Sequence, residues 1–386
     1  MRIWLMALYV FLFFATGCID RVFFEMAKPV NYGIVISGFI SDQPGPYEVR
    51  VTTAFDIESK ESVRKEVSVR KMVISDNIGN SETLTEVKPG IYQTNANGLR
   101  GVVGGIYTMK LELLDGAVFE SYPDTILAPS SLDSLYVKFS DKYNELAAKE
   151  YFADIFFDAS LNRTQNKKIM WRLNGTFKAM THPEIPNGGC HYSEELVRCN
   201  FVPPCSGYRN VGTNAHPIFE KLFPCTCCTC WYDIHENVPM LSDELFSNSQ
   251  QIKEVKISSI PLNEWTLWYR LRVEVAQRVL TRNSFAFFKA IRDQKEATDN
   301  LFQPISGRIP SHFTQLEGTQ TLISGIFFAT SVSSKVIHIQ RFGTPPAILL
   351  PSNLTFAITL DEPVWAGDCR LRFGNSTNTM PSFWED

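Results

Sequence analysis

The chain has 386 residues, of which 44% are hydrophobic and 20% charged, and its formal net charge is −4. This length predicts two domains with cores of their own, and the slightly acidic balance excludes a general attraction to nucleic acid or to anionic lipid surfaces. The 28 phenylalanines, 21 prolines and 22 glycines form a composition typical of short strands joined by turns.

The first seventeen residues have the pattern of a bacterial lipoprotein signal peptide. Arg2 precedes an apolar run over residues 3–14, and three small residues then lead directly to Cys18. The run is well short of the ~20 residues that span a bilayer, and small residues before the cysteine suit signal-peptide cleavage. We therefore expect residues 1–17 to be removed and Cys18 to be lipidated. The alternatives are an ordinary signal peptide with a chance cysteine, or a buried apolar helix at the N-terminus.

A lipidated Cys18 determines the compartment. The mature chain would fold outside the cytoplasm, and acyl chains would hold it on a membrane at ~0.8 kcal/mol per buried methylene. Residues 18–30 would form the lipidated tether. The most apolar later segment, residues 322–330, is too short to cross a bilayer and contains Ser324 and Gly325. The sequence thus predicts an anchored protein rather than an integral one.

Short strands alternate with turns over residues 31–128. Residues 47–51 and 107–113 alternate apolar and polar side chains with a period of two. Asp115-Gly116 follows the second of these strands and predicts a two-residue hairpin turn. Six or seven strands with a turn every ~8–12 residues are typical of an immunoglobulin-like β-sandwich, which we predict for residues 31–128.

The second region, residues 129–386, is predicted to be rich in β-structure with one helix. Ser284 can cap this helix, and apolar side chains at Phe285, Phe288 and Ile291 give it a buried stripe. Strand signals occur at residues 135–139, 151–157, 169–173, 252–257, 268–275, 321–329, 335–339 and 356–360. The fold class we predict is therefore mainly β.

An irregular, loop-like insertion over residues 183–235 contains all but two of the nine cysteines. With Cys18 lipidated, an even number remains in an oxidising compartment, which favours disulfide bonds. Each bond would contribute ~2–4 kcal/mol to an insertion with little core of its own. The candidates are Cys190, Cys199, Cys205, Cys225, Cys227, Cys228, Cys230 and Cys369. Their connectivity stays open.

A metal site is the alternative interpretation of this cluster. Further ligands could come from His191, His216 and His235. Structural zinc sites typically separate paired cysteines by two or more residues, however. In an extended segment, single-residue spacing points Cys225 and Cys227 to one face, and Cys228 and Cys230 then point to the other. This arrangement favours disulfides, with the adjacent Cys227 and Cys228 bonded to different partners. We therefore expect no metal and no cofactor.

No catalytic motif occurs in the sequence. A Gly-x-Ser-x-Gly elbow, a His-Glu-x-x-His pair, a phosphate loop and a glycine-rich dinucleotide turn are all missing. The six histidines are scattered, and the adjacent acids Asp361 and Glu362 do not by themselves define an acid–base pair. We expect a protein that is not an enzyme.

Two tripeptides have the form aspartate, then serine or threonine, then an aliphatic residue. They begin at Asp124 and at Asp133. The pattern resembles the O-glycosylation acceptor that Bacteroidota use for exported proteins, so Thr125 and Ser134 are candidate acceptors. The alternative is chance, because aspartate–serine pairs are common in turns.

A series of motifs runs through nearly the whole mature chain in a characteristic order. It comprises Gly38 with Gly45-Pro46-Tyr47, Gly90-Ile91-Tyr92, Gly104-Gly105-Ile106-Tyr107, Trp171 with Asn174-Gly175-Thr176, Pro224 with the cysteine cluster and Trp231, Phe287-Phe288, Leu301-Phe302 with Pro304, Ile323-Ser324-Gly325-Ile326-Phe327, and Cys369-Arg370 with Pro381-Ser382-Phe383-Trp384. In this order the chain resembles the Bacteroidota lipoproteins of domain of unknown function 4249. It departs from them around Pro304, where the family is richer in proline, and at Cys369, where a pair of cysteines is frequent. The single Cys369 favours a long-range disulfide to the cluster at residues 190–230.

The resemblance implies a location and a partner rather than a chemistry. Such proteins are often encoded beside SusC-like TonB-dependent transporters. This implies a lipid-anchored accessory on the outer membrane, facing the cell surface, that helps to capture or admit a substrate. The alternative is a stand-alone surface binding or adhesion lipoprotein that uses aromatic loops such as Trp231-Tyr232 and residues 265–269. An enzyme is the third hypothesis.

Overall fold

The computed structural model covers most of the chain from Gly33 onward. It describes residues 33–53, 65–160, 168–183, 191–193, 196–198, 203–213, 218–236, 238–242, 251–298, 309, 311–343, 346–358, 365, 367–373 and 376–385. The predicted signal peptide and Cys18 lie outside these residues, as do Cys190, Cys199 and His216.

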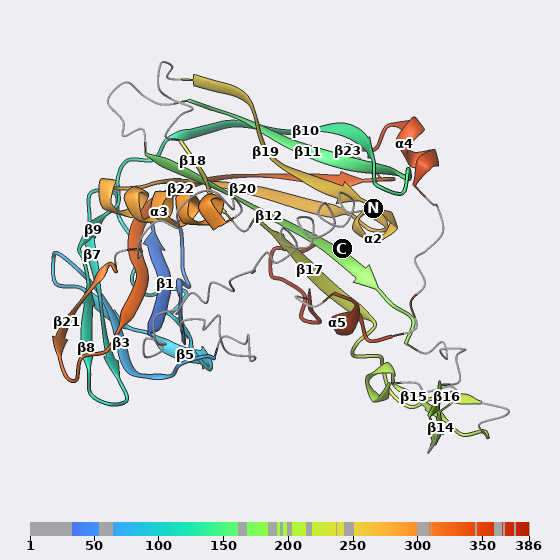
Figure 1. Cartoon of the computed structure of the whole chain (residues 1–386), viewed down its shortest axis with the longest axis horizontal. Helices are drawn as coiled ribbons and strands as arrows, with labels where there is room; N and C mark the ends of the chain where they lie inside the picture. Colours follow the sequence, from blue (N-terminus) through green and yellow to red (C-terminus); the bar gives the residue numbers. More distant parts are fainter. Residues whose placement is uncertain are drawn as a thin grey trace, which may run out of the picture.

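The protein is mainly β and contains two β-sandwiches that share one long strand (Figure 1). The predicted fold class is therefore confirmed. The first sandwich carries the N-terminal strands. The second carries the longest strands and, at its far end, a small cysteine-rich module.

Two sheets face each other in the first sandwich. One consists of β1 (Ile34–Ser41), β2 (Glu48–Thr53), β6 (Ile91–Gln93), β5 (Thr85–Lys88) and the first half of β22 (Ile323–Gln340). The other consists of β21 (Phe313–Glu317), β8 (Val118–Ser121), β7 (Ile106–Leu113), β3 (Val69–Asp76), β4 (Ser81–Thr83) and β9 (Asp124–Thr125). Their shared core includes the fully buried Ile36, Val49, Met72 and Met109.

The second sandwich has the same layered construction. One sheet consists of β17 (Thr229–His235), β12 (Ile169–Met180), β20 (Leu271–Val279) and the second half of β22, with β18 (Met240–Leu241), β23 (Ile348–Leu349) and β24 (Ser376–Thr377) at its edges. The facing sheet consists of β10 (Ser131–Tyr143), β11 (Lys149–Ser160) and β19 (Gln251–Leu262). Trp171 and Phe157 meet in the core, with ring centroids 5.0 Å apart.

Strand β22 belongs to both sandwiches. Its first half pairs in parallel with β1, from Ile34 opposite Ile323 to Ser41 opposite Thr330. Its second half pairs antiparallel with β20, starting where Ser331 lies opposite Val279. The first sandwich therefore extends beyond the predicted residues 31–128, because β21 and the first half of β22 also belong to it.

Helix α3 (Arg282–Thr298) is the one long helix among the described residues, as predicted. Phe285, Phe287 and Phe288 are buried on its inner face, against Ile326 and Phe328 of β22. It begins earlier than predicted. Because Thr281 accepts a hydrogen bond from the backbone of Ser284 at 3.5 Å, Thr281 and not Ser284 holds the capping position.

Local details differ from the sequence prediction in three further places. Among the described residues, three short helices occur besides α3, namely α2 (Glu264–Leu267), α4 (Ser352–Ala357) and α5 (Cys369–Arg372). Helix α4 covers the first two residues of the stretch predicted as a strand at residues 356–360. The hairpin between β7 and β8 has three loop residues rather than two, because Leu113 bonds to the carbonyl of Ala117. Only Gly116 in that loop has a positive φ, of 89°.

In the part of the chain that is described, no helix has the length and apolarity to span a membrane.

The predicted insertion at residues 183–235 is only partly irregular. It contains a short 3-10 turn, η1 (Pro204–Ser206), and two small hairpins made of β13 (His191–Ser193), β14 (Leu196–Arg198), β15 (Tyr208–Asn210) and β16 (Phe219–Lys221). This module projects from the second sandwich (Figure 1). Its last predicted residues form β17, which pairs with β12 inside the main sheet.

Candidate functional site

A cavity of about 400 Å³ lies beneath α3, where the two sandwiches meet. Five elements supply most of its surface: the outer face of β1, the first half of β22, strands β12 and β20, and the inner face of α3. Its apolar lining comes mainly from Phe39, Phe287, Phe288, Ile291, Ile326 and Phe328.

The alternation of β1 explains why it contributes to this cavity. Ile36 and Ile40 point into the core of the first sandwich and are fully buried. Val35, Ser37 and Phe39 occupy the alternate positions and therefore point away from that core, toward the second sandwich. One strand thus builds a core on one face and a binding surface on the other.

The same alternation applies to the first half of β22. Ile323 and Phe327 pack in the core of the first sandwich, whereas Ile326 and Phe328 face α3. Gly325 allows the close approach to β1, because a Cβ atom there would lie 1.9 Å from the carbonyl oxygen of Ile36 and its φ is +105°. The two adjoining faces of β22 are therefore both buried.

Aromatic rings form a continuous wall of the cavity. Phe328 contacts Phe39 at a centroid distance of 5.6 Å and Phe288 at 5.2 Å, the latter nearly edge to face. Phe287 continues the series, 5.6 Å from Phe288. Such tilted and edge-to-face arrangements are the ones that aromatic pairs prefer, so the rings stabilise one another's positions.

Two arginines project into the same cavity from neighbouring strands. In the antiparallel register, Arg172 of β12 lies opposite Ala276 and Arg278 of β20 lies opposite Met170, so both arginines share one face of the sheet. The guanidinium carbon of Arg278 lies 4.4 Å from the ring centroid of Phe39, a cation–π arrangement. The Nε atom of Arg278 is buried without a hydrogen-bond partner.

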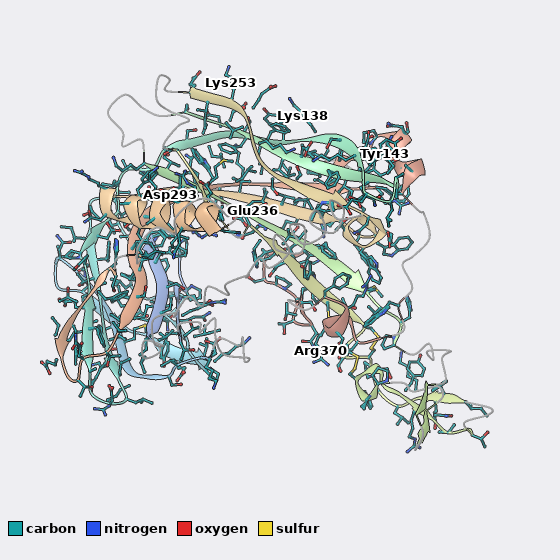
Figure 2. The ribbon with its side chains drawn as sticks, in the orientation of Figure 1. Lys138, Tyr143, Glu236, Lys253, Asp293 and Arg370 are labelled. Carbon is teal, nitrogen blue, oxygen red and sulfur yellow. A yellow bond between two sulfur atoms is a disulfide. The ribbon has the colours of Figure 1, made fainter. Side chains whose placement is uncertain are left out.

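Burial lowers the pKa of both arginine side chains. It lowers the pKa of Arg278 to about 10, and the positive charge of Arg172 acts in the same direction, while Glu274 opposes it. Burial likewise lowers the pKa of Arg172. Both groups are nevertheless cationic near neutral pH. Arg172 donates from Nη1 to the backbone carbonyl of Glu236 at 3.3 Å, and Glu236 is labelled close to α3 in Figure 2.

The acidic residues near these arginines already have partners. Glu48, at the rim of the cavity, accepts from Nε of Arg50 at 2.6 Å. Glu274 accepts from Nη2 of Arg272 at 2.9 Å. Within the described chain, no carboxylate forms an ion pair with Arg172 or Arg278. The cavity therefore carries two uncompensated positive charges beside an aromatic wall.

A larger hollow, of about 610 Å³, lies at one end of the first sandwich. Asp76 is its acidic residue, but the Asp76 carboxylate is occupied by its own hairpin. It accepts from the backbone N–H groups of Ile78 and Asn80, at 3.0 and 2.8 Å, and from the Asn80 side chain. These bonds also lower the Asp76 pKa. The Asp76 carboxylate stabilises its own turn, so this hollow has fewer groups available to bind a ligand than the cavity beneath α3.

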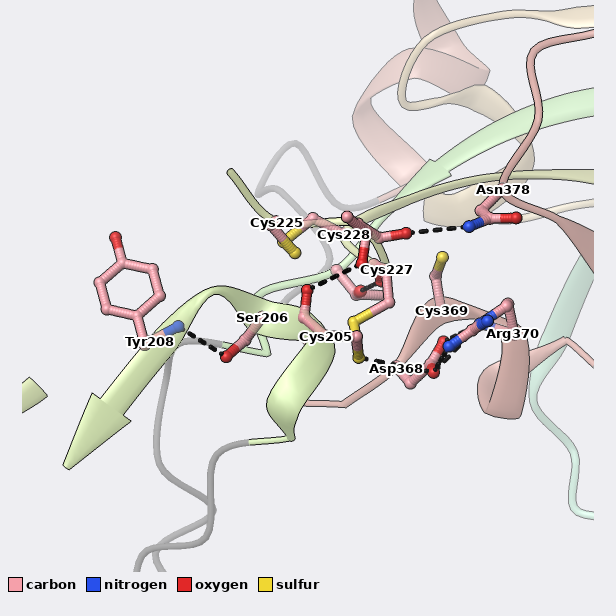
Figure 3. The surroundings of a disulfide bond; sticks show 12 residues. Cys205, Ser206, Tyr208, Cys225, Cys227, Cys228, Asp368, Cys369, Arg370 and Asn378 are labelled. Carbon is pink, nitrogen blue, oxygen red and sulfur yellow. Dashed lines mark hydrogen bonds and ion pairs between the residues drawn. A yellow bond between two sulfur atoms is a disulfide. The ribbon is translucent and has the colours of Figure 1, made fainter. Parts of the chain in front are cut away.

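The cysteine cluster forms disulfide bonds (Figure 3). Cys205 bonds to Cys227 and Cys225 to Cys228, with Cα–Cα distances of 5.6 and 5.7 Å. Cys230 bonds to Cys369, with a Cα–Cα distance of 5.8 Å. The adjacent Cys227 and Cys228 have different partners, and Cys369 is tied to the cluster, as predicted.

The predicted alternation of these cysteines is wrong in detail. Residues 226–228 bend rather than extend, so that Cys225 and Cys228 reach each other, and the strand begins only at Thr229. Among the described residues, Cys205, Cys227 and Asp368 are the one group close enough to hold a metal ion. Because the two sulfur atoms are bonded to each other, they are not thiolate ligands.

The candidate glycosylation residues lie at the junction but make structural contacts. Ser134 donates to the Asp158 carboxylate at 2.7 Å and is half-buried. Thr125 is half-buried next to Asp124, a buried residue that accepts from Ser284 at 2.6 Å and from the backbone of Ala329 at 3.1 Å. Modification of Thr125 and Ser134 stays a prediction.

The aromatic residues proposed for adhesion are mostly buried. Trp231 and Trp265 belong to the core, and Tyr232 packs against Phe373 with ring centroids 5.4 Å apart. Sequence reasoning did not select Arg172 or Arg278. One feature of the sequence could have indicated Arg172 as a site residue: it is the one charged residue in the otherwise apolar strand at residues 169–173.

The architecture defines a two-sandwich β-protein with a ligand-sized cavity between its halves. Residues 21–336 match the family described as Domain of unknown function (DUF4249), and the chain belongs to that family. No curated protein and no solved structure matches the chain.

Proposed function

We propose that the protein is a non-catalytic binding protein, lipid-anchored to the outer membrane, that captures a substrate for a TonB-dependent transporter. The observation that carries the proposal is the cavity beneath α3, where a wall of packed aromatic rings meets Arg172 and Arg278. Small-molecule sites typically occupy ~300–1,000 Å³ and combine an apolar lining with a few polar groups. The cavity has both properties.

The chemical groups of the lining support binding rather than turnover. The ionisable residues lining the cavity are Glu48, Arg50, Arg172 and Arg278. A hydrolytic or transfer reaction needs a nucleophile beside a base, or an acid–base pair, at the reacting atoms. Guanidinium groups instead hold and orient an anion. We therefore assign the cavity to capture.

The tether from a lipidated Cys18 would be short enough to keep the cavity near the membrane. The first strand begins at Ile34. A fully extended chain advances ~3.5 Å per residue, so a tether from a lipidated Cys18 reaches ~55 Å. This distance would keep the first sandwich, and with it the cavity, close enough to the membrane to pass a ligand to an integral transporter.

Affinity purification tests the proposal. A tagged protein extracted with mild detergent from its native membranes should carry with it a large β-barrel transporter, identified by mass spectrometry. The Cys18→Ala variant, which we expect to be released from the membrane, is the matched control. Repeated recovery of the wild-type protein without any transporter would contradict the accessory role.

Stand-alone surface binding or adhesion is the second candidate function. One observation favours it: the cysteine-rich module exposes apolar side chains at Val211, Ile218, Leu222 and Phe223. Glycan and peptide arrays probed with the soluble chain from residue 19 would detect such binding. Array binding that disappears when Ile218 and Phe223 are replaced by serine would favour adhesion, whereas no array binding would favour the transporter role.

A further inference from the structure

The cavity beneath α3 has a cationic corner that no carboxylate of the described residues compensates by an ion pair. Burying a charge without a partner opposes folding, and buried arginines in proteins are usually paired with carboxylates. Among the described residues, Arg172 has a single backbone acceptor and Arg278 has no hydrogen-bond acceptor. A bound anion would compensate both charges.

The geometry of Arg278 shows which atoms can meet an anion. Its Nε atom is buried beside Phe39 and is not accessible to solvent or to a ligand. Its two Nη atoms make no hydrogen bond within the described chain either, yet they are not sealed, and the side chain lines the cavity. The terminal edge of the guanidinium is thus free to donate two parallel hydrogen bonds, the arrangement in which arginine binds carboxylate or phosphate.

The rest of the cavity requires a different chemistry. Phe288 and Ile291 of α3 and Phe328 of β22 offer no hydrogen bonds. A small inorganic anion would compensate the charges of the arginines but leave this apolar wall exposed to water. An uncharged apolar molecule would cover the wall but leave the charges uncompensated. A ligand that satisfies both surfaces has two unlike ends.

We propose, on the basis of the capture function above, that the ligand is a small amphiphile with one anionic head group. The head group, a carboxylate or a phosphate, binds between Arg172 and Arg278, and the apolar body lies on the phenylalanine wall. At ~30 Å³ per water, a cavity of about 400 Å³ holds roughly a dozen waters, so the ligand has on the order of 12–20 non-hydrogen atoms.

Binding of matched probes to the soluble full chain tests this inference. Decanoate and decyl phosphate carry the two head groups on one apolar chain. Decan-1-ol and decyltrimethylammonium carry the same chain without an anion, and acetate and inorganic phosphate carry the anion without the chain. We expect at least one of the two anionic amphiphiles to bind tenfold or more tightly than any of the four controls, as measured by calorimetry.

Arginine variants connect the binding to the site. Arg278→Met and Arg172→Met should each weaken binding of the anionic amphiphile at least tenfold, and Arg278→Lys should weaken it less. Arg70→Met is the matched control, because Arg70 is an exposed strand arginine paired with Glu112 and lies outside the cavity. Circular dichroism would verify that each variant is folded.

The outcomes are distinct. Preference for decanoate over decyl phosphate identifies a carboxylate ligand, and the reverse identifies a phosphate. Equal binding of decan-1-ol, equal binding of inorganic phosphate, binding unaffected by Arg278→Met, or no binding of any probe would each overturn the inference. Recovery of a transporter is measured independently, so the accessory function can survive while the amphiphile inference fails.

Discussion

Arg278 lies over the ring of Phe39, with its guanidinium carbon 4.4 Å from the ring centroid. Phe39 belongs to β1 of the first sandwich and Arg278 to β20 of the second, so the contact joins the two halves of the molecule at the cavity. The first two predictions concern this pair.

Replacing Arg278 with methionine should not destabilise the protein. The guanidinium is buried without a carboxylate partner, and an apolar side chain of similar length removes that cost while filling the same volume. We expect the free energy of unfolding to be unchanged or higher by ~1 kcal/mol. Urea denaturation measures it, with Arg70→Met as the control. A loss of more than ~1 kcal/mol would assign Arg278 a structural role instead.

Binding of an anionic amphiphile should depend on pH through Arg278. The pKa of this group is lowered to about 10, mainly by burial. Binding should therefore be constant from pH 7 to 9 and weaken as the pH passes about 10. Between this value and the higher pKa of an arginine in the unfolded chain, the unfolded chain holds a proton that the folded chain has lost. Folding is therefore favoured by rising pH and does not confound the result. Calorimetry on the wild type should show the dependence, and the residual binding of Arg278→Met should lack it.

Asp124 should be essential to the junction. Its buried carboxylate joins β9 to α3 through Ser284, at 2.6 Å, and to β22 through the backbone of Ala329, at 3.1 Å. Asp124→Ala leaves both donors unsatisfied and should cost ~2–3 kcal/mol of unfolding free energy. Ser284→Ala should cost less, and a double-mutant cycle should show coupling between the two. The exposed Asp141→Ala is the control, with an expected change within ~0.5 kcal/mol. Additive effects of the Asp124 and Ser284 variants would contradict the bridge.

The three disulfides should differ in their contribution to stability. Cys230 and Cys369 are 139 residues apart, whereas Cys225 and Cys228 are three apart. Loop-closure entropy then assigns ~5 kcal/mol to the first bond and ~1.5 kcal/mol to the second. Replacing each pair with alanine and measuring denaturant unfolding tests the order. Equal losses would show that native-state strain or residual unfolded structure dominates.

Lipidation should be required for membrane attachment. Cys18→Ala removes the thiol that would receive the diacylglyceryl group, so the variant should move from the membrane fraction to the soluble fraction. Fractionation and immunoblotting measure the distribution. Wild-type processing that is insensitive to globomycin, together with a soluble wild-type protein, would refute the lipoprotein assignment.

Local patterns predicted much of this molecule. The alternation at residues 107–113 corresponds to β7, the apolar stripe containing Phe285 and Phe288 corresponds to α3, and the crowding of cysteines corresponds to disulfides. Each of these features depends on neighbours within about ten residues, so each leaves a signal that can be read along the chain.

The shared strand and the cavity escaped prediction because they depend on partners far away in sequence. Ile34 pairs with Ile323, and no local periodicity specifies that partner. Arg172 and Arg278 become a pair only through the register between β12 and β20. The cavity arises where these long-range pairings bring two sandwiches together, which is why it could not be located from the residues alone.

The position of β22 near the end of the chain constrains the order in which the protein folds. Strands β1 to β9 emerge first, but β1 has a free edge until residues 323–330 arrive to pair with it. The first sandwich is therefore the earliest to be made and among the last to be finished. A partly folded chain must keep that edge from pairing with other chains until β22 docks, and a protein truncated before β22 would expose it permanently.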